Sequence, residues 1–347
     1  MIPALYILSI LLILITLLPL VKNDNWFFRI FDYPRLQKFF LSAIVLFFLL
    51  YCCDYSNTTN LVFVVIMAVN IIYLTIIILP FTVFGKKQVL RINKTIPEQG
   101  ISILISNVYQ DNTNYNGCLE QIDKVKPDIV LLLETDKKWQ EQLNLEKKYD
   151  YSVTVPLDNT YGMLLYSNLE LRDSEIKYLV EKDVPSIHTK IVLRNGKEVQ
   201  FFAVHPTPPV PNENPRATER DKELLLVADL AKKSTLPVIV AGDLNDVAWS
   251  HTTSLFLKMS EMLDPRRGRG FYNSFHAHYF FLRFPLDHAF ISPHFKLKEM
   301  KRLDNYNSDH FPIFISLQYE ESAKVVQHQE KPDAEEIKEA QEKKAKS

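Results

Sequence analysis

The sequence predicts an α+β domain with mixed or antiparallel β-sheets, preceded by helices that cross a membrane. Long uncharged apolar stretches occupy the N-terminal part of the chain, and the remainder alternates short β-rich apolar segments with helical patterns. The composition is otherwise ordinary: of 347 residues, 47% are hydrophobic and 23% are charged, and the formal net charge is -1. These values exclude a disordered chain, a collagen-like chain and a protein that binds polyanions through bulk positive charge.

Three apolar stretches, 1–21, 36–53 and 61–84, have about the length that a helix needs to cross the hydrocarbon core. A cleaved signal peptide is disfavoured, because no basic region precedes the first stretch and no small-residue cleavage site follows it. Core helices of a soluble protein are disfavoured as well, because these segments are apolar all round and lie close together near one end. We therefore expect residues 1–84 to form three transmembrane helices.

The distribution of lysine and arginine predicts which way these helices face. Basic residues occur in the first loop and in the basic connector 85–98, whereas the second loop, 54–60, has none. The basic residues concerned are Lys22, Arg29, Arg35, Lys86, Lys87, Arg91 and Lys94. The positive-inside rule then places the large domain in the cytoplasm, as part of a multi-pass protein of the cell membrane. The orientation is reversed if the weakest stretch, 36–53, does not insert.

Residues 99–319 are expected to form the globular domain, and residues 320–347 a charged, solvated and partly helical tail. Segments typical of strands recur through the domain, at 101–106, 128–133, 163–167, 189–193, 199–204, 237–242, 288–292 and 311–319. Apolar residues at helical spacing occur over 116–126, 220–233 and 252–262. Asn195-Gly196 lies between two strand segments and predicts a hairpin with a type I′ turn.

Polar and ionisable residues are found where the predicted strands begin or end. Each of them taken alone is more readily explained as a turn or capping residue. Strand ends and strand starts share one edge of a sheet when neighbouring strands are antiparallel, however, so all of these residues can meet in a single site. The residues are Asn107, Glu134, His205, Asp243, Asn245, Asp287, Asp309 and His310.

The residue types in this set favour a hard divalent cation. Carboxylate and amide oxygens suit Mg²⁺, Mn²⁺ or Ca²⁺, and no Cys/His cluster has the spacing of a zinc site. The chain contains no GxxxxGK[ST] or GxGxxG loop for a nucleotide and no GxSxG nucleophile. The chemistry that remains is metal-assisted attack of water on a phosphoester. An Asp or an Asp–His pair activates the water, and a His protonates the leaving oxygen.

At these residues the sequence resembles the endonuclease/exonuclease/phosphatase superfamily. The motifs occur in the family's order: SNV (106–108), LLLE (131–134), YGMLLYS (161–167), HP (205–206), GDLN (242–245), LDH (286–288) and SDH (308–310). Segments 107–134 and 266–275 look most like the membrane-anchored bacterial members. The resemblance implies a four-layer α/β/β/α sandwich with two mixed β-sheets.

The resemblance also implies a metal site. Glu134 would bind Mg²⁺ (or Mn²⁺), and Asn107 and Asp309 would complete or support the coordination of the ion. His288 is the last residue of the LDH motif and follows Asp287, so its side chain is expected to face away from the site along the strand. The basic run 266–269 has two interpretations, a solvated loop or a clamp on a second phosphate.

Five further residues carry catalytic roles by the same resemblance. Asp243 would orient or deprotonate the attacking water, and Asn245 would hold a phosphate oxygen. His310 would pair with Asp287 at the scissile phosphate, and His205 would donate a proton or a hydrogen bond to it.

The predicted function is that of a membrane-anchored, divalent-metal-dependent hydrolase of a phosphodiester or phosphomonoester. Tethering favours a lipid head group or another substrate held at the membrane surface, because anchoring raises its effective concentration. Two alternatives stay open. One is a nuclease of the same chemistry acting on DNA or RNA, which the lack of net positive charge disfavours. The other is a non-catalytic membrane adaptor. The sequence does not indicate the oligomeric state.

Overall fold

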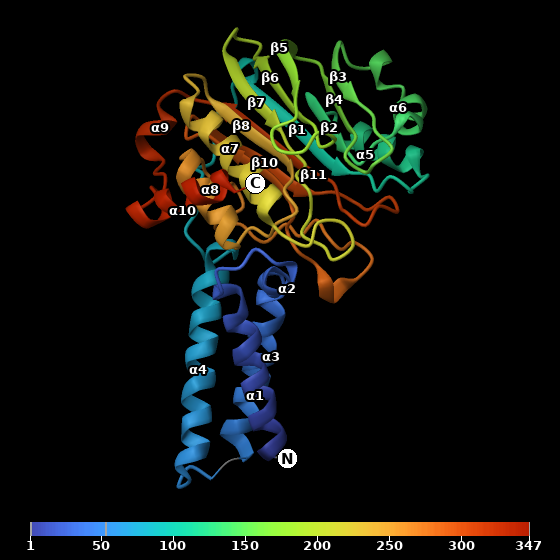
Figure 1. Ribbon diagram of the computed structural model, residues 1–347. Coiled ribbons are helices and arrows are strands. Elements are labelled where there is room, and N and C mark those ends of the chain that lie inside the picture. The colour runs from blue at the N-terminus through green and yellow to red at the C-terminus, as the bar shows by residue number, and fades with distance from the viewer. Residues whose placement is uncertain (1, 53, 347) are drawn as a thin grey trace.

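The computed structural model describes residues 2–52 and 54–346. Met1, Cys53 and Ser347 lie outside the described residues, so the start of the first apolar stretch, the end of the second and the last residue of the tail are not covered. A stalk of long helices carries a globular α+β domain (Figure 1).

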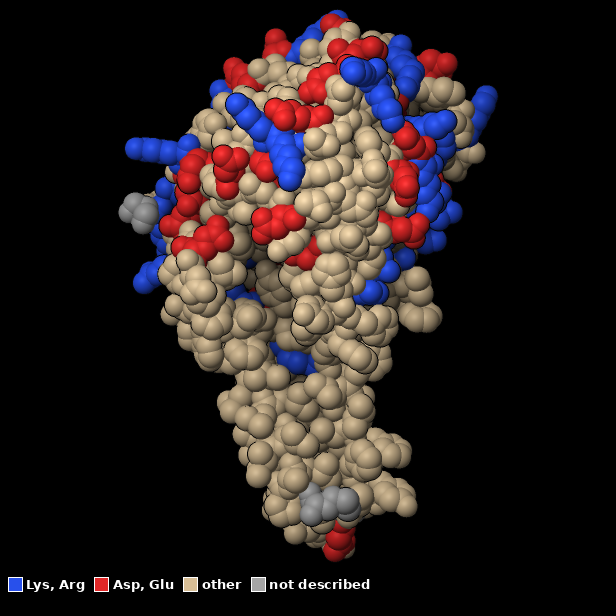
Figure 2. Space-filling view, turned by 90° about the vertical axis from the view of Figure 1, so that its right-hand side faces the viewer, with Lys and Arg blue, Asp and Glu red and all other residues tan. Residues whose placement is uncertain are grey.

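The stalk consists of helices α1 (Ile2–Leu17), α3 (Arg35–Cys52) and α4 (Thr58–Ile78). Together with short 3-10 turns, they give three segments of 19, 18 and 24 residues that are long and apolar enough to cross a membrane. Figure 2 shows that acidic and basic side chains cover the globular domain but are nearly absent from the visible face of the stalk. The three predicted apolar stretches are therefore helical, with the surface expected of membrane spans.

Two polar side chains inside the stalk form hydrogen bonds to neighbouring segments. The Asn70 side chain on α4 donates to Ser42 Oγ on α3 at 2.9 Å. Lys38 Nζ donates to the carbonyl oxygens of Ile15 (3.0 Å) and Phe31 (2.8 Å) near the domain end of the stalk. These bonds satisfy groups that would otherwise be costly in an apolar surrounding, and they join the helices to one another.

The segment between α1 and α3 joins the stalk to the domain. It contains η1 (Leu18–Leu20), α2 (Trp26–Arg29) and η2 (Ile30–Asp32). The Trp26 amide donates to Pro215 O at 2.9 Å, and the Ala217 amide donates to Asp24 O at 2.8 Å. We call residues 22–34 the docking segment, because it packs against the domain through backbone hydrogen bonds.

The domain contains two mixed sheets. Strands β1 (Gly100–Asn107), β2 (Ile129–Leu133), β3 (Tyr151–Val155), β4 (Met163–Ser167), β10 (Phe295–Arg302) and β11 (Ile313–Tyr319) form the first, in the order β10-β11-β1-β2-β4-β3. Strands β5 (Glu170–Lys177), β6 (Ser186–Val192), β7 (Glu198–Ala203), β8 (Val238–Asp243) and β9 (Asp287–Ile291) form the second, in that order. The pairs β1–β2 and β7–β8 are parallel, and the other pairs are antiparallel.

Helices cover the outer faces of both sheets, which completes the predicted α/β/β/α sandwich (Figure 1). Alternation along β1 shows how: Ile101, Ile103 and Ile105 pack in the core between the sheets, whereas Leu104 packs toward the helices. Helices α5 (Tyr115–Val125) and α6 (Lys137–Leu143) cover the first sheet, and α7 (Thr218–Lys233) and α8 (His251–Ser260) cover the second. The remaining 3-10 turns are η3 (Leu79–Phe81), η4 (Pro97–Gln99), η5 (Leu145–Lys147) and η6 (Phe280–Leu282).

Three strands were not predicted from the sequence, and each of them is an edge strand. They are β3, β5 and β10, at the ends of the strand orders. Strand β5 has the sequence ELRDSEIK and is mostly exposed. An edge strand contacts fewer neighbours, so it tolerates polar residues that hide the apolar pattern.

The C-terminal segment is more structured than the solvated tail that was expected. It forms α9 (Ala323–Val326) and α10 (Ala334–Ala345), and α10 begins with an Asp333–Glu336 capping box. Ala340 is fully buried against the cluster of α7 and α8, and Lys343 Nζ binds Asp221 at 2.6 Å. The prediction of a partly helical segment is confirmed, but α10 packs as part of the outer helical layer.

The hairpin between β6 and β7 is confirmed, but its turn is not type I′. Of the two central residues predicted, only Gly196 has a positive φ, at +81°. The Gly196 amide donates to Leu193 O, and the Leu193 amide donates to Lys197 O. The loop that joins the strands therefore ends in a left-handed glycine, which is typical of three-residue hairpin loops.

Candidate active site

The eight residues predicted for the site come from six strand ends that meet where both sheets face the stalk. Asn107 ends β1, Glu134 follows β2, and His205 follows β7. Asp243 ends β8 and lies directly opposite Asp287, the first residue of the antiparallel strand β9. The remaining members, Asn245, Asp309 and His310, occupy the loop after β8 and the segment before β11. Antiparallel pairing is what brings strand starts and strand ends to one edge.

An Asp–His–Asp cluster forms the buried centre of the site. His310 Nδ1 lies 2.7 Å from Asp287 Oδ2, and His310 Nε2 lies 3.5 Å from Asp243 Oδ2. The three residues are at most 4% exposed. Burial alone lowers the pKa of His310, but the carboxylates of Asp287 and Asp243 outweigh it and raise that pKa to about 10. The imidazole is therefore positively charged at neutral pH.

Asn107 connects the two sheets at this centre. Its side-chain Nδ2 donates to Glu134 Oε1 at 2.7 Å and to Asp243 Oδ2 at 3.2 Å. Burial raises the pKa of Glu134 to about 7, and the hydrogen bond from Asn107 acts against that rise. Glu134 also has a left-handed backbone, with φ of +58°. Such a conformation is costly for a residue other than glycine, and it turns the carboxylate away from the strand direction.

Gly242 allows Asp243 to approach the neighbouring parallel strand. Its φ is +148°, and a Cβ atom at this position would lie 1.9 Å from Val204 O. No other residue fits there without moving the backbone. The glycine of the GDLN motif therefore sets the close packing of β8 against the end of β7.

His205 and Asn245 lie on the second sheet's side of the site. His205 is 2% exposed and its Nδ1 atom has no hydrogen-bond partner among the described residues. Burial lowers the pKa of His205 to about 4, although Asp243 acts in the opposite direction. The Asn245 amide donates to Asp243 Oδ1, and its side-chain Nδ2 donates to Pro206 O, both at 2.9 Å. The imidazole is neutral, with a ring nitrogen free for a ligand.

The charge balance of the site fits a cation. No lysine or arginine in the described part of the chain forms an ion pair with Glu134, Asp243 or Asp309. The carboxylates of Asp309 and Asp243 each act to raise the pKa of Glu134, and Asn107 donates to both Glu134 and Asp243. Asp309 Oδ1 is buried without a hydrogen-bond partner among residues 2–52 and 54–346. Unpaired hard oxygen atoms with surplus negative charge are the surroundings that Mg²⁺ and Mn²⁺ prefer.

A second grouping also has the geometry of a metal site. Ligand atoms of Asp243, Asp287 and His310 all lie within 4.8 Å of one another. Asp287 already occupies Nδ1 of His310, however, and the ring is held in its protonated form by the two carboxylates. A protonated imidazole does not bind a cation, so in this form the trio suits acid–base chemistry, and the oxygen atoms of Glu134 and Asp309 are a second candidate for a cation site.

Two residues that hold the site were missed by the sequence analysis. Tyr33 Oη, on the docking segment, and Arg220 Nη1, on α7, both donate to the backbone carbonyl of Asn245, at 3.0 and 2.8 Å. Arg220 is 1% exposed and also binds Asp221. Neither lies in a motif, and Tyr33 lies in the membrane-proximal part, so no local pattern marks them.

The basic run 266–269 is neither a solvated loop nor a clamp on a second phosphate. Arg266 is 1% exposed and binds Asp264 and His288 Nδ1. Arg269 donates to backbone carbonyls, and Arg267 pairs with Glu330. The run is therefore structural. His288 is fully buried, with Nε2 2.9 Å from Asp246 O, and faces away from the Asp–His–Asp cluster as expected.

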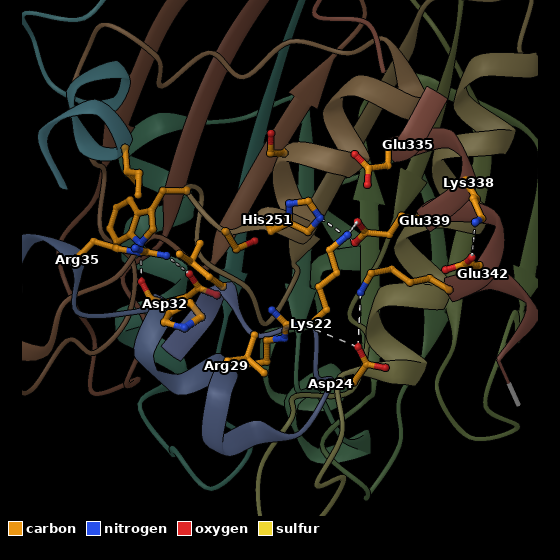
Figure 3. A pocket seen from close by; sticks show the side chains of 18 of the residues that line it. Lys22, Asp24, Arg29, Asp32, Arg35, His251, Glu335, Lys338, Glu339 and Glu342 are labelled. Atoms are coloured by element: carbon orange, nitrogen blue, oxygen red, sulfur yellow. Dashed lines mark hydrogen bonds and ion pairs between the residues drawn. The ribbon is translucent and has the colours of Figure 1, made fainter. Parts of the chain in front are cut away.

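A cavity of about 600 Å³ lies apart from these residues, between the docking segment, the start of α8 and helix α10. Figure 3 shows charged side chains of the docking segment and of α10 around it, together with His251 at the start of α8. His251 pairs with Glu339 at 2.7 Å, and Lys346 pairs with Asp24. Most of the charges are already paired with one another, so the cavity is a polar junction between stalk and domain.

Comparisons with known proteins agree with this fold. The model of the Endonuclease/Exonuclease/phosphatase family matches residues 104–310. No curated protein matches the chain by sequence. Among solved structures, the endonuclease/exonuclease/phosphatase from Bacteroides vulgatus is 19% identical, with a TM-score of 0.51 over 65% of this chain and 100% of that chain.

Two animal proteins have the same fold. The human Nocturnin catalytic domain is 16% identical, with a TM-score of 0.51 over 67% of this chain and 96% of that chain. Danio rerio TDP2, solved with a single-stranded DNA product, is 18% identical, with a TM-score of 0.50 over 63% of this chain and 99% of that chain. At such identities these likenesses concern the fold alone.

Proposed function

Because this chain belongs to the endonuclease/exonuclease/phosphatase family, we propose that it is a membrane-anchored, divalent-metal-dependent hydrolase of phosphoesters. The observation that carries the proposal is the buried Asp243–His310–Asp287 cluster, together with the carboxylates of Glu134 and Asp309, which form no ion pair among the described residues. A positive imidazolium next to a cation site is suited to a phosphate group, on which negative charge builds up during water attack.

Glu134 and Asp309 would hold Mg²⁺ or Mn²⁺, and Asn107 would support them, because its Nδ2 faces Glu134 and Asp243 while its Oδ1 accepts the Tyr109 amide. A bound ion of this kind neutralises the phosphate oxygens and so favours attack at phosphorus. In the structure, Asn107 keeps the Glu134 carboxylate in place through its 2.7 Å hydrogen bond. Asn107 also donates to Asp243, so one side chain orients both Glu134 and the residue proposed to activate water.

Asp243 is placed to orient the attacking water and accept its proton. His310, fixed by Asp287 and positively charged, lies beside Asp243 and stabilises charge on the phosphate. His205 is neutral at physiological pH, so it acts as a hydrogen-bond donor to the phosphate rather than as a proton donor. Asn245 has one amide hydrogen on Pro206 O and a second one left for a phosphate oxygen.

We further propose that the protein crosses the cell membrane several times and keeps its catalytic domain in the cytoplasm. The three apolar helices support the membrane assignment. The basic residues of the first loop and of the connector support the orientation, through the positive-inside rule.

The test is a phosphate-release and diester-cleavage screen with the full chain in detergent micelles and Mg²⁺ or Mn²⁺. Phospholipids, small soluble phosphoesters and plasmid DNA are the substrates, and DNA alone as a substrate would favour the nuclease alternative. Asp243→Asn should lower kcat by a hundredfold or more, about 3 kcal/mol of transition-state stabilisation, by analogy with the loss of one oxyanion donor.

Asp173→Asn is the matched control, because Asp173 is exposed on edge strand β5 and asparagine suits its φ of +48°. It should leave kcat unchanged. Full activity of the Asp243→Asn protein would refute the assignment. A parent protein that neither binds a divalent ion nor cleaves any of these substrates would support the adaptor alternative.

A further inference from the structure

A hairpin next to the site carries an exposed aromatic tip. Its two arms pair between Phe275 and Phe284, and its tip is the run Tyr279–Leu282. The four tip residues are exposed by 58%, 71%, 79% and 52% in sequence order. Contiguous large apolar side chains on a soluble domain mark a surface that meets another apolar phase. We call residues 275–284 the aromatic hairpin.

The tip lies at the level where a membrane helix leaves the domain. Gln37 Nε2, in the first turn of α3, donates to Phe281 O at 2.6 Å. Figure 1 shows the hairpin, in orange, projecting from the domain beside α2, on the side from which the stalk leaves. Because α3 is long and apolar enough to cross a membrane, its first turn marks the height of the membrane surface.

The base of the same hairpin contacts the reaction centre. The Ala277 amide donates to Asp309 O at 2.6 Å, and the Phe275 ring lies 5.0 Å from the His310 ring, centroid to centroid. Just before the hairpin, Ser274 Oγ accepts the Asp287 amide at 3.0 Å. One short element thus runs from the membrane surface to the Asp–His–Asp cluster.

Contacts of Tyr33 and of two arginines also link the site to the side of the domain from which α3 leaves. Tyr33, two residues before α3, donates to the carbonyl of Asn245. Arg283 and Arg302 lie over the Phe311 ring, at 4.9 and 4.3 Å from its centroid, next to His310. Arg283 belongs to the hairpin and Arg302 donates to Asn273 O just before it, so both add positive charge next to the site.

We propose that the aromatic hairpin enters the interfacial layer of the bilayer and that the site faces that bilayer, so that its substrate is the phosphoester of a lipid head group. Aromatic side chains favour the membrane–water interface, where the ring leaves water and the backbone stays hydrated. The substrate class rests on the proposed hydrolase function, whereas insertion of the hairpin does not.

Insertion is tested with the full chain reconstituted into phosphatidylcholine/phosphatidylglycerol vesicles. Phe281→Trp adds one fluorophore to Trp26, Trp139 and Trp249. The difference spectrum against the parent should be blue-shifted and quenched by lipids brominated near the head group. An added emission that is quenched by aqueous iodide and not by brominated lipid would overturn the proposal.

The substrate class is tested with Phe280→Ser/Phe281→Ser. Hydrolysis of vesicle phospholipid should fall at least tenfold, while hydrolysis of bis-p-nitrophenyl phosphate stays unchanged, which also shows that the variant is folded. The matched control is Val325→Ser/Val326→Ser, two consecutive exposed apolar residues in α9, at 72% and 54% exposure. It should leave both activities unchanged.

The outcomes separate this inference from the hydrolase assignment. A parent that cleaves the soluble ester or DNA but no phospholipid would end the lipid proposal and leave the hydrolase standing. A parent that cleaves nothing would end the hydrolase assignment, and the quenching of the added emission in the Phe281→Trp variant would still decide whether the hairpin inserts.

Discussion

Two histidines of the site show how burial and charge divide the roles of one residue type. His205 and His310 are both almost fully buried. Burial depresses the pKa of each, but only His310 has carboxylates in direct contact, and their attraction reverses the direction of the shift. One imidazole is therefore neutral and the other charged, although the sequence shows the same residue at both positions.

Glu223 gives a pH prediction away from the site. It lies on α7, is 1% exposed, and its Oε1 atom has no hydrogen-bond partner among the described residues. Burial, with a smaller effect of Glu181, raises the pKa of Glu223 to about 8. The folded state thus keeps a proton that the unfolded chain releases above the ordinary glutamate pKa of 4.5. The stability contributed by this group is complete below that value and is lost as the pH rises toward 8.

Glu223→Gln should remove this pH dependence. The variant and the parent should have similar Tm values near pH 4, and the variant should become progressively more stable than the parent as the pH is raised toward 8. Thermal unfolding of the full chain in detergent at a series of pH values measures this. Glu120→Gln, an exposed position on α5, is the control and should show no such trend. A constant Tm difference between parent and Glu223→Gln at every pH would contradict the argument.

Among the elements, α10 stands out because its residues reach toward the site through a chain of ion pairs. Lys343 Nζ binds Asp221, Asp221 binds Arg220, and Arg220 donates to Asn245 O. Burial raises the pKa of Asp221, but Arg220 and Lys343 outweigh it and hold that pKa well below its usual range. The carboxylate therefore stays ionised and depends on both cations.

Lys343→Ala should lower the free energy of unfolding by about 2 kcal/mol, because it leaves a buried carboxylate with one cationic partner in place of two. Denaturation of the full chain in detergent gives the value. Lys338→Ala is the control on the same helix. The Lys338 side chain is 76% exposed and its pair with Glu342 is long, at 3.8 Å, so the substitution should cost no more than about 0.5 kcal/mol. Equal effects of the two substitutions would show that α10 is not anchored through Asp221.

At the scale of the whole molecule, the site exists only where the two sheets meet. Asn107 and Glu134 come from the first sheet, Asp243 and Asp287 from the second, and the 3.2 Å bond from Asn107 to Asp243 crosses between them. Carboxylates gathered from both sheets repel one another in the folded state. A bound cation removes that repulsion, so its effect extends to the stability of the entire domain.

Mg²⁺ or Mn²⁺ should therefore raise the Tm of the full chain, with a gain of about 2.7 kcal/mol at a hundredfold excess over Kd. Glu134→Gln should reduce that gain strongly, because one charged oxygen ligand is lost. Glu141→Gln, an exposed position on α6, should leave it intact. A Tm shift that is the same in the parent and in Glu134→Gln would place the cation elsewhere.

Local patterns in the sequence were enough to predict the three long apolar helices, the central strands and the candidate residues at the strand ends. The apolar stretches, the alternation along β1 and the polar residues at strand ends each depend on near neighbours in the chain. The order of motifs then led to the four-layer sandwich. Edge strands such as β5 escaped prediction because half of their surroundings is solvent, which accepts almost any residue.

Only the tertiary structure decided which segments far apart in the sequence contact one another. The bond from Tyr33 to Asn245 joins residues 212 positions apart, and the packing of α10 on α7 and the place of the aromatic hairpin beside α3 also join segments that are far apart in sequence. Such contacts arise when whole elements pack, and the residues that make them carry no periodic signal of their own. The sequence by itself therefore determined which residues are candidates for the site, whereas packing decided that they meet and that the docking segment contacts them.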